Sequence, residues 1–267
     1  MHGVMAYSLV MRSTMRNAPD DGGRVAGVQS VERAFALLLA FTDDGPSVRS
    51  LGELAESSGL AKPTVHRIAS TLVAQGALER ADSGYRLGLR LFELGGRVQV
   101  RRDLREAALP FMEDLYEATH HTVHLAILET SDVVYLERIR GHQPIRLPSE
   151  VGARLPAHCT GVGKALLAHS PGALDGRRSL PAQTRRSITA LDVLERDLER
   201  IRATGVAIDH EEARLGVRCV AAPIFVGSAA VAALSVSGPS DQINVNYLTI
   251  AVRAGANGVG RVLASPR

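Results

Sequence analysis

The chain has 267 residues, enough for two domains that each bury a core of their own. Hydrophobic residues make up 45% and charged residues 22%, values typical of globular proteins, while aromatic residues at 4% argue against a stacking platform for single-stranded nucleic acid. The net charge of +3 is uneven: residues 1–102 hold 13 Lys and Arg against 10 Asp and Glu, whereas residues 103–267 hold 18 of each. A basic surplus in the first part is typical of a segment that contacts phosphates.

The first residues and the cysteines bear on where the protein works. Residues 1–26 have neither the compact basic start nor the sustained apolar stretch of a secretion signal, and we expect a disordered arm there. The longest apolar run, residues 34–41, is too short to cross a bilayer, so no membrane partner is expected. Cys159 and Cys219 give no disulfide framework, which favours a reducing cytoplasm.

The first predicted helix covers residues 30–41. Its apolar side chains follow helical spacing and are expected to supply one wall of a small core. The members of this stripe are Val31, Ala34, Phe35, Leu38 and Leu39.

Two short helices joined by a tight turn follow in SLGELAESSGLAKPTVHRIASTLVAQG, residues 50–76. Ser50 and Glu53 have the spacing of a capping box, which predicts a helix from Leu51. Gly59 can adopt the left-handed conformation that ends a helix, and Pro63 suits the first position of the next one.

The second of these helices has two distinct faces. Val65, Ile68, Ala69, Leu72 and Val73 form an apolar stripe that predicts a buried face. The other face carries short or basic side chains, which suit a helix that approaches the floor of the DNA major groove. The candidate DNA contacts on it are Lys62, Pro63, Thr64, His66, Arg67 and Ser70. The alternative is an ordinary helical hairpin with a solvated face, because helix-turn-helix patterns also match hairpins that do not bind DNA.

A β-hairpin is predicted after the helix pair. Residues 77–80 and 85–88 flank the turn-forming residues 81–84, so the two strands form a wing beside the second helix. Arg80 and Arg86 lie on these strands, where they can neutralise phosphates or enter a minor groove.

The rest of the chain predicts a linker and a second domain. We expect a connecting helix over residues 89–100, weakened by Gly95 and Gly96, with the domain boundary near residues 101–103. Further helices are expected over 104–119, after Gly161, over 190–203 and over 246–263. Strands are expected over 123–130, 133–140, 206–209, 217–225 and 229–237. Hairpins mixed with helices indicate an α+β domain with a largely antiparallel sheet.

Several stretches in this order resemble the IclR family of bacterial transcription regulators, over residues 27–263. The stretches are VQSVERAFALLLAF, LGELAESSGLAKPTVHRIASTLVAQGAL, YRLG, LPAHCTGVGKALLA and LGVRCVAAPIF. The resemblance implies a winged helix-turn-helix domain over 27–88, a linker helix over 89–102 that pairs two subunits, and a GAF-like effector-binding α/β domain over 103–267. It also implies a homodimer or tetramer that binds double-stranded DNA at a pseudo-palindromic operator, under the control of a small organic acid.

The GVGK fragment in LPAHCTGVGKALLA is not a phosphate loop, because His158 and Ala165 stand where that motif needs a glycine and a hydroxyl. The amides near Gly161 and Val162 can bind a carboxylate at a helix start, or they can belong to a purely structural cap. Ser235 and Ser237 are two apart and share a sheet face. On the resemblance, the effector site is lined by Gly161, Val162, Asp209, Cys219, Ser235 and Ser237, with Leu147, Leu155, Val217 and Val231 as apolar surroundings.

Two other classes of function compete with this interpretation. A thiol enzyme would need an oriented base beside His158–Cys159 or His210 with Cys219, and no further motif supports one, so no enzyme activity is expected. A metal-sensing regulator is the stronger alternative, because His120, His121, His124, His158, His210 and both cysteines are permissible ligands. No spacing among them defines a site, so neither a metal nor another cofactor is assigned. The sequence therefore predicts a cytoplasmic, ligand-responsive transcription regulator, in our interpretation a repressor.

Overall fold

A computed structural model describes residues 27–41, 45–142 and 149–265, and for residues 99–102 it describes the backbone alone. The expected arm over residues 1–26 and the candidate effector residue Leu147 lie outside the described residues. The chain divides into two compact units that meet between Arg97 and Val98, slightly before the expected boundary.

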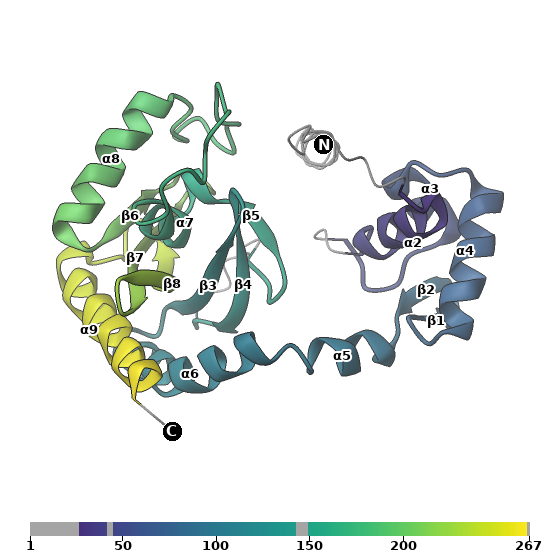
Figure 1. Cartoon of the computed structure of the whole chain (residues 1–267), viewed down its shortest axis with the longest axis horizontal. Helices are drawn as coiled ribbons and strands as arrows, with labels where there is room; N and C mark the ends of the chain where they lie inside the picture. The colour runs from purple at the N-terminus through teal and green to yellow at the C-terminus, as the bar shows by residue number, and fades with distance from the viewer. Residues whose placement is uncertain (1–26, 42–44, 143–148, 266–267) are drawn as a thin grey trace. The chain divides into compact units, whose positions relative to one another are not determined.

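The first unit is a three-helix bundle with a β-hairpin. Its elements are α2 (Gln29–Leu39), α3 (Leu51–Ser58), α4 (Lys62–Ala74), β1 (Leu78–Ala81) and β2 (Gly84–Leu87). Figure 1 shows the antiparallel hairpin beside α4, and a small core joins all five elements. Leu37, Leu54, Val65, Ala69 and Tyr85 are buried in this core.

The turn between α3 and α4 forms as the sequence predicts. The Ser50 hydroxyl accepts a hydrogen bond from the amide of Glu53 at 3.3 Å, and the Glu53 carboxylate accepts one from the Ser50 amide at 2.8 Å. Gly59 ends α3 with φ of 69°, a left-handed conformation that glycine adopts without strain. Pro63 lies one position later than expected, as the second residue of α4, where its missing amide hydrogen still costs no intrahelical bond.

The predicted apolar stripe of α2 is only partly confirmed, because Leu38 packs against the small core and Ala34 is half-buried, but other members are exposed. Leu37 and Ala40 are the side chains buried around this helix, whereas Val31, Phe35 and Leu39 are exposed, Phe35 by 59%. A helix that is apolar on more than one side offers periodicity no unique choice of buried face. The exposed side of α2 is therefore an apolar surface on the first unit.

The linker also differs from the single helix expected over residues 89–102. Helix α5 spans Leu89–Gly95, and α6 spans Gln99–Thr119, so the chain leaves helical geometry at residues 96–98. Two adjacent glycines carry the largest entropic cost of helix formation, which explains why the break falls there. Helix α6 thus contains both the end of the expected linker and the helix expected over residues 104–119.

The second unit is built on one antiparallel sheet of six strands in the order β5-β4-β3-β8-β7-β6. The strands are β3 (Thr122–Glu129), β4 (Asp132–Ile139), β5 (Arg154–Pro156), β6 (Ala207–His210), β7 (Val217–Val226) and β8 (Ala229–Pro239). Five of them match the expected strands to within a few residues, and the short β5 was missed because three residues show no periodicity.

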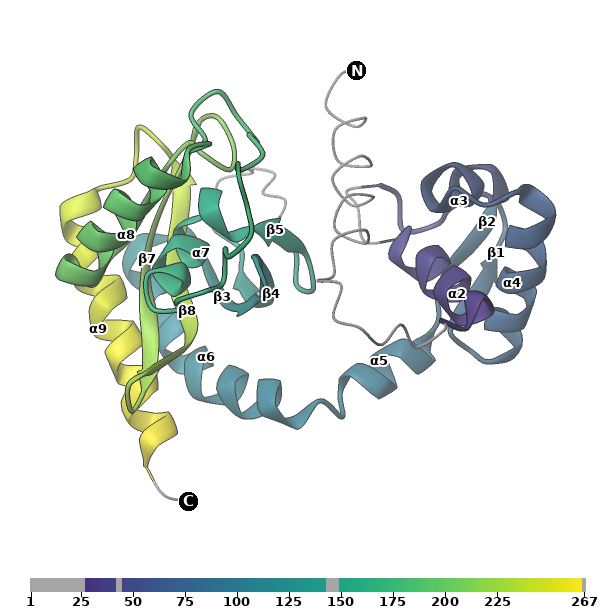
Figure 2. The ribbon, with the colours of Figure 1, turned by 45° about the horizontal axis from the view of Figure 1, so that its top comes forward.

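Helices cover both faces of this sheet, as Figures 1 and 2 show. On one face α6 and α9 (Val245–Ala264) pack over Leu125, Val220 and Leu234. On the other face lie a short 3₁₀ turn (Ala157–Cys159), α7 (Gly161–Leu167) and α8 (Leu191–Thr204), over a second apolar cluster. The α+β class is confirmed: a helix-turn-helix with a β-hairpin wing precedes a unit built on an antiparallel sheet flanked by helices.

No helix within the described residues is long and apolar enough to cross a membrane.

Candidate functional site

The first candidate site is the exposed face of α4, which we call the reading face. Lys62, Pro63, His66 and Arg67 are exposed on it, and Thr64 and Ser70 are half-buried at its edges. Helix α4 contains no acidic residue. Val65 and Ala69 are buried on the opposite side of the helix. Packing of that side against the core fixes the orientation of α4 and leaves the reading face exposed. Such a face can enter a major groove and place its donors near base edges and phosphates.

The two arginines of the wing lie on opposite faces of the hairpin. Arg80 pairs in register with Tyr85, and its guanidinium carbon lies 5.7 Å from the centre of the Tyr85 ring. Arg86 pairs with Glu79 on the other face and forms an ion pair with it at 2.8 Å. The hydrogen bond from Arg86 holds the pKa of Glu79 below its usual range. Both guanidinium groups are exposed, and Arg86 differs from Arg80 in having an acidic partner on the wing.

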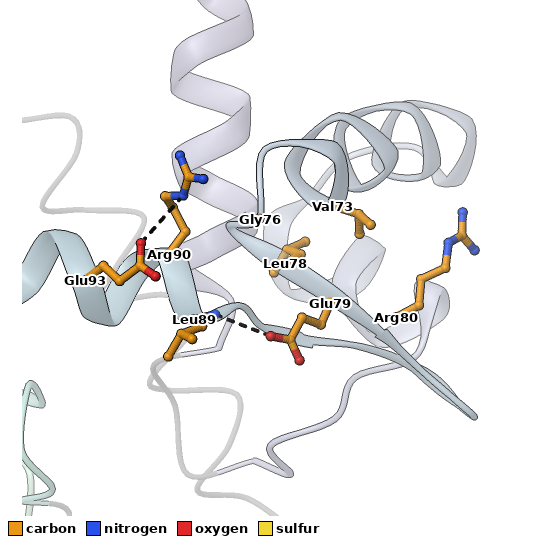
Figure 3. A pocket seen from close by; sticks show the side chains of 8 residues that line it. All are labelled: Val73, Gly76, Leu78, Glu79, Arg80, Leu89, Arg90 and Glu93. Carbon is orange, nitrogen blue, oxygen red and sulfur yellow. Dashed lines mark hydrogen bonds and ion pairs between the residues drawn. The ribbon is translucent and has the colours of Figure 1, made fainter.

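A shallow hollow of 380 Å³ lies beside the wing, where the end of α4, strand β1 and the start of α5 meet (Figure 3). The Glu79 carboxylate accepts the amide hydrogen of Leu89, and Glu93 lies 3.8 Å from Arg90. Both carboxylates of the hollow therefore have partners among its lining residues. The hydrogen bond from Leu89 to Glu79 links the start of α5 to the wing.

The second candidate site is a polar patch on the sheet face that α7 covers. Strand register places Asp209, Cys219 and Ser237 side by side on β6, β7 and β8, with Ser235 in the next row of β8. All four side chains are buried. The structure therefore brings together four of the six described residues expected at an effector site, and we call this group the sheet patch.

The start of α7 lies directly over this patch. A Cβ atom added at Gly161 would stand 2.8 Å from the Cys219 sulfur, so only glycine fits that contact. Thr160 caps the helix by accepting a hydrogen bond from the Gly163 amide at 3.0 Å, and Val162 is buried with the neighbouring apolar cluster. Gly161 thus lies against the patch and Val162 lies in the adjoining apolar cluster, and the structural cap that the sequence left as an alternative is also present. Leu155 is buried in the same cluster, but Val231 is exposed and was wrongly placed.

Lys164 is a residue whose role the sequence did not indicate. It is 1% exposed, and its ammonium group donates to Glu212 at 2.5 Å and to the Ile208 carbonyl at 2.8 Å, with Asp197 at 2.9 Å. Burial alone would lower the pKa of Lys164, but the charges of Glu212 and Asp197 outweigh it and raise the pKa. This network ties α7 to α8 and β6 beneath the patch.

Two side chains of the sheet patch have raised pKa values. Burial, followed by the charge of Glu212, raises the pKa of Asp209 to about 7. Burial and the charge of Asp209 raise the pKa of Cys219 to about 11, so its thiol stays protonated at neutral pH. A protonated, buried thiol is a poor nucleophile, and Cys219 behaves here as a small apolar side chain.

The fold separates several of the side chains on which the thiol-enzyme and metal alternatives depend. His210 pairs with Arg218, so it faces away from Cys219, whose partner on β6 is Asp209. Helix α6 ends at Thr119 and β3 starts at Thr122, so His120 and His124 never form a helical pair. Across the described parts of the chain, no three His, Cys, Asp or Glu side chains cluster closely enough to hold a metal ion.

Comparisons with known families match both units. The family described as the C-terminal part of the bacterial transcriptional regulator IclR matches residues 97–261, and the IclR helix-turn-helix domain matches residues 30–82.

Two curated relatives illustrate the similarity. The HTH-type transcriptional regulator BhcR of Paracoccus denitrificans is 37% identical over 233 residues, covering 84% of this chain and 80% of that protein. The transcriptional repressor IclR of Escherichia coli is 32% identical over 231 residues, covering 83% of this chain and 84% of the repressor.

Solved structures agree with the fold and extend over both units. An IclR homologue from Microbacterium hydrocarbonoxydans, crystallised with 4-hydroxybenzoate, is 29% identical with a TM-score of 0.78, covering 88% of this chain and all of that one. The Thermotoga maritima IclR structure is 29% identical with a TM-score of 0.71, covering 90% of this chain and all of its own. Together with the two domain matches, these similarities show that the chain belongs to the IclR family of DNA-binding bacterial transcriptional regulators.

Proposed function

We propose that the protein is a cytoplasmic repressor that binds a pseudo-palindromic operator through the reading face of α4 and the Arg80 side of the wing. The observation that carries this proposal is the separation of α4 into a buried apolar side and an exposed basic side without acidic residues. Arg67 has the reach and the fork of donors to contact a guanine edge, and Lys62 and Ser70 suit phosphate oxygens. The E. coli relative named as a repressor supports the sign of regulation.

Operator symmetry requires two copies of the reading face, and exposed apolar side chains supply a pairing surface. On α2 these side chains are Val31, Phe35 and Leu39. On α5 they are Leu89, Phe92 and Leu94, of which Phe92 is 78% exposed. Exposed apolar side chains grouped on a helix are typical of protein interaction sites, and we propose that these helices pair subunits into a homodimer or tetramer.

The effector we propose is a small organic acid bound at the sheet patch under the start of α7. The Microbacterium relative, whose structure contains 4-hydroxybenzoate, supports this class of ligand. Binding would favour one arrangement of the linker helices and so change operator affinity by a coupling free energy of about 1–3 kcal/mol.

The test measures binding of the full-length protein to the DNA upstream of its own gene, by fluorescence anisotropy over a range of salt concentrations. We expect salt-dependent binding that exceeds binding to a scrambled fragment. Arg67→Ala should lose about 1–3 kcal/mol on the operator and much less on the scrambled fragment, because it removes a base contact. Arg196→Ala, at an exposed arginine of α8, is the matched control and should bind as the parent does.

Equal losses on both fragments would assign Arg67 to phosphate contacts instead of base reading. Failure of the parent to prefer its upstream DNA over the scrambled fragment would contradict the operator role of the reading face.

A further inference from the structure

Lysine is rare in this chain. Of its 31 lysines and arginines only Lys62 and Lys164 are lysines, so the other 29 are arginines. Both kinds of side chain are cationic, but an arginine stays protonated in proteins, whereas a lysine amine can lose its proton and act as a nucleophile. The side-chain amines of the protein are therefore confined to two positions.

Lys164 is an amine that the folded protein keeps unreactive. It is 1% exposed. Its ammonium group donates to Glu212 at 2.5 Å and to the Ile208 carbonyl at 2.8 Å, and Asp197 lies 2.9 Å away. A compact ammonium group can serve three acceptors that converge on one point, which the planar fork of a guanidinium cannot. The structure therefore accounts for a lysine at this position, and its partners and burial prevent the amine from attacking a reagent.

Lys62 has no internal partner of this kind. It is the first residue of α4 and is exposed, and no described residue forms a hydrogen bond or ion pair with its ammonium group. An arginine at this position would contact DNA phosphates equally well, so the property that lysine alone adds is a reactive amine. Both cysteines are buried, and their thiols do not compete with this amine for a reagent.

The surroundings of Lys62 favour reagents that carry phosphate. The start of a helix is the positive end of its dipole, α4 contains no acidic residue, and Arg67 is exposed about one turn further along the reading face. These features suit the phosphates of DNA and attract other phosphate-bearing molecules for the same reason. Acyl phosphates and the acyl thioesters of coenzyme A are activated carboxylic acids that carry phosphate groups.

We propose that Lys62 is an acylation site on the reading face, which takes a short acyl group from a phosphate-bearing donor, either an acyl phosphate or an acyl thioester of coenzyme A, and that acylation releases the operator. The release of DNA rests on the proposed operator role of the reading face. The acyl group makes the nitrogen a neutral amide, so the charge that meets a DNA phosphate is lost.

The reaction balances without any further reagent. The neutral amine of Lys62 attacks the acyl carbon and forms an amide C–N bond, while the C–O bond to phosphate or the C–S bond to coenzyme A breaks. The leaving group takes the electron pair of the broken bond. Of the three protons of the ammonium group, one stays on the amide nitrogen, one ends on the phosphate or the thiol, and one is released to water.

Peptide mass mapping of the full-length protein after treatment with acetyl phosphate, or separately with acetyl coenzyme A, locates the modification. In the folded protein acetylation should appear at Lys62 and not at Lys164. In urea it should appear at both, because unfolding separates Lys164 from its carboxylates. Saturating DNA from upstream of the protein's own gene should slow acetylation of Lys62 about tenfold, because bound DNA covers the amine.

A donor without phosphate tests the role of the surroundings. N-hydroxysuccinimidyl acetate acetylates amines and carries no phosphate. For Lys62, the rate in the folded protein divided by the rate in urea should be about two- to fivefold higher with acetyl phosphate than with this ester, as expected for an anion beside a helix start.

Fluorescence anisotropy measures the effect on DNA binding. Acetylation of the parent should weaken binding to the upstream DNA about tenfold for each copy of the reading face and reduce its salt dependence. Lys62→Arg has no amine to acetylate, so its affinities before and after treatment should be equal, whatever its starting affinity. Lys62→Gln resembles acetyl-lysine and should bind as weakly as the treated parent. The variants keep the amino-terminal amine, so the comparison separates Lys62 from it.

The outcomes distinguish this inference from the proposed function. Acetylation of Lys164 before Lys62 in the folded protein, no reaction of Lys62 with either donor, or equal rate ratios for acetyl phosphate and the ester would overturn the site. Unchanged DNA affinity after acetylation of Lys62, or an equal loss for treated Lys62→Arg, would overturn its effect on DNA. Each of these results leaves the operator role intact if the untreated protein prefers its upstream DNA. If the untreated protein shows no such preference, the operator role is wrong and the switch falls with it.

Discussion

The chain has only two lysines, and they illustrate how differently its two units use charge. Lys62 begins α4 and is exposed on the reading face, whereas Lys164 is buried in α7 between Glu212 and Asp197. The first is solvated and free to meet a macromolecular anion. The second has its full complement of internal partners, because a buried charge is tolerated only when it is paired.

The same contrast holds for the serines and histidines. Ser70 and His66 lie on a surface where water satisfies any unused hydrogen-bonding group. Ser235 and His124 lie in the interior, where each donor and acceptor needs a partner. Exposed polar groups therefore indicate a binding partner through their spatial arrangement. Buried polar groups indicate one when a donor or acceptor has no hydrogen-bond partner in the protein.

The largest effect should come from removing the buried lysine. Lys164→Met leaves Glu212 and Asp197 without their shared cation, and we expect a loss of about 3–5 kcal/mol in the free energy of unfolding. Chemical denaturation measures it, with Lys62→Met as the matched control, expected within about 0.5 kcal/mol of the parent. A loss below about 1 kcal/mol for Lys164→Met would mean that the network is not the internal anchor described here.

Next in size is a pH effect at Asp209. Its pKa is about 7 when folded, above the ordinary 3.8, so between these values the folded chain retains a proton that the unfolded chain has released. Asp209 thus lowers stability by roughly 1 kcal/mol per unit as pH rises from about 4 to about 7. Asp209→Asn cannot titrate, so its stability relative to the parent should rise over that range.

Denaturation of both proteins at several pH values checks the effect of Asp209. His124 titrates with the opposite sign, since its lowered pKa costs stability on acidification, but it is common to both proteins and cancels in the difference. Parallel stability curves for the parent and Asp209→Asn would show that Asp209 is charged in the folded protein.

In the first unit, the two wing arginines should differ in how much they contribute to operator binding. Arg80→Ala should weaken operator binding by about 1 kcal/mol and reduce the salt dependence by about one phosphate contact. Arg86→Ala should do less, because the ion pair with Glu79 already engages its guanidinium. Anisotropy titrations at several salt concentrations compare them, and a larger loss for Arg86→Ala would reverse the assignment.

The smallest expected effect is a gain in operator affinity. Glu79→Gln removes the charge that holds Arg86 while keeping an oxygen that can accept from the Leu89 amide. Operator affinity should rise by a few tenths of a kcal/mol, since exposed ion pairs are weak. Glu195→Gln on α8, where the carboxylate pairs with Arg202, is the control and should leave DNA affinity unchanged. No gain for Glu79→Gln would mean that Arg86 does not approach the DNA.

Local patterns were sufficient for much of the first unit. The capping box at Ser50, the left-handed Gly59 and the apolar spacing from Val65 depend on neighbours within one or two helical turns, and all three are confirmed. The same logic held only in part at α2, where Leu38 packs against the core but Phe35 is exposed. Periodicity finds an apolar stripe but cannot determine whether the core or another subunit covers it.

Only the tertiary structure shows which side chains lie around the sheet patch. Sequence alone places Ser235 and Ser237 on one face, because alternation along a strand is a local rule, and the resemblance supplied the other members. The neighbours His124 and Arg138 come from strands about a hundred residues away, and only strand order and register bring them beside Ser235. The partners of Lys164 likewise come from α8 and from the segment after β6. Local rules therefore determined which segments fold and which helix presents a reading face, while long-range pairing decided which buried polar groups meet.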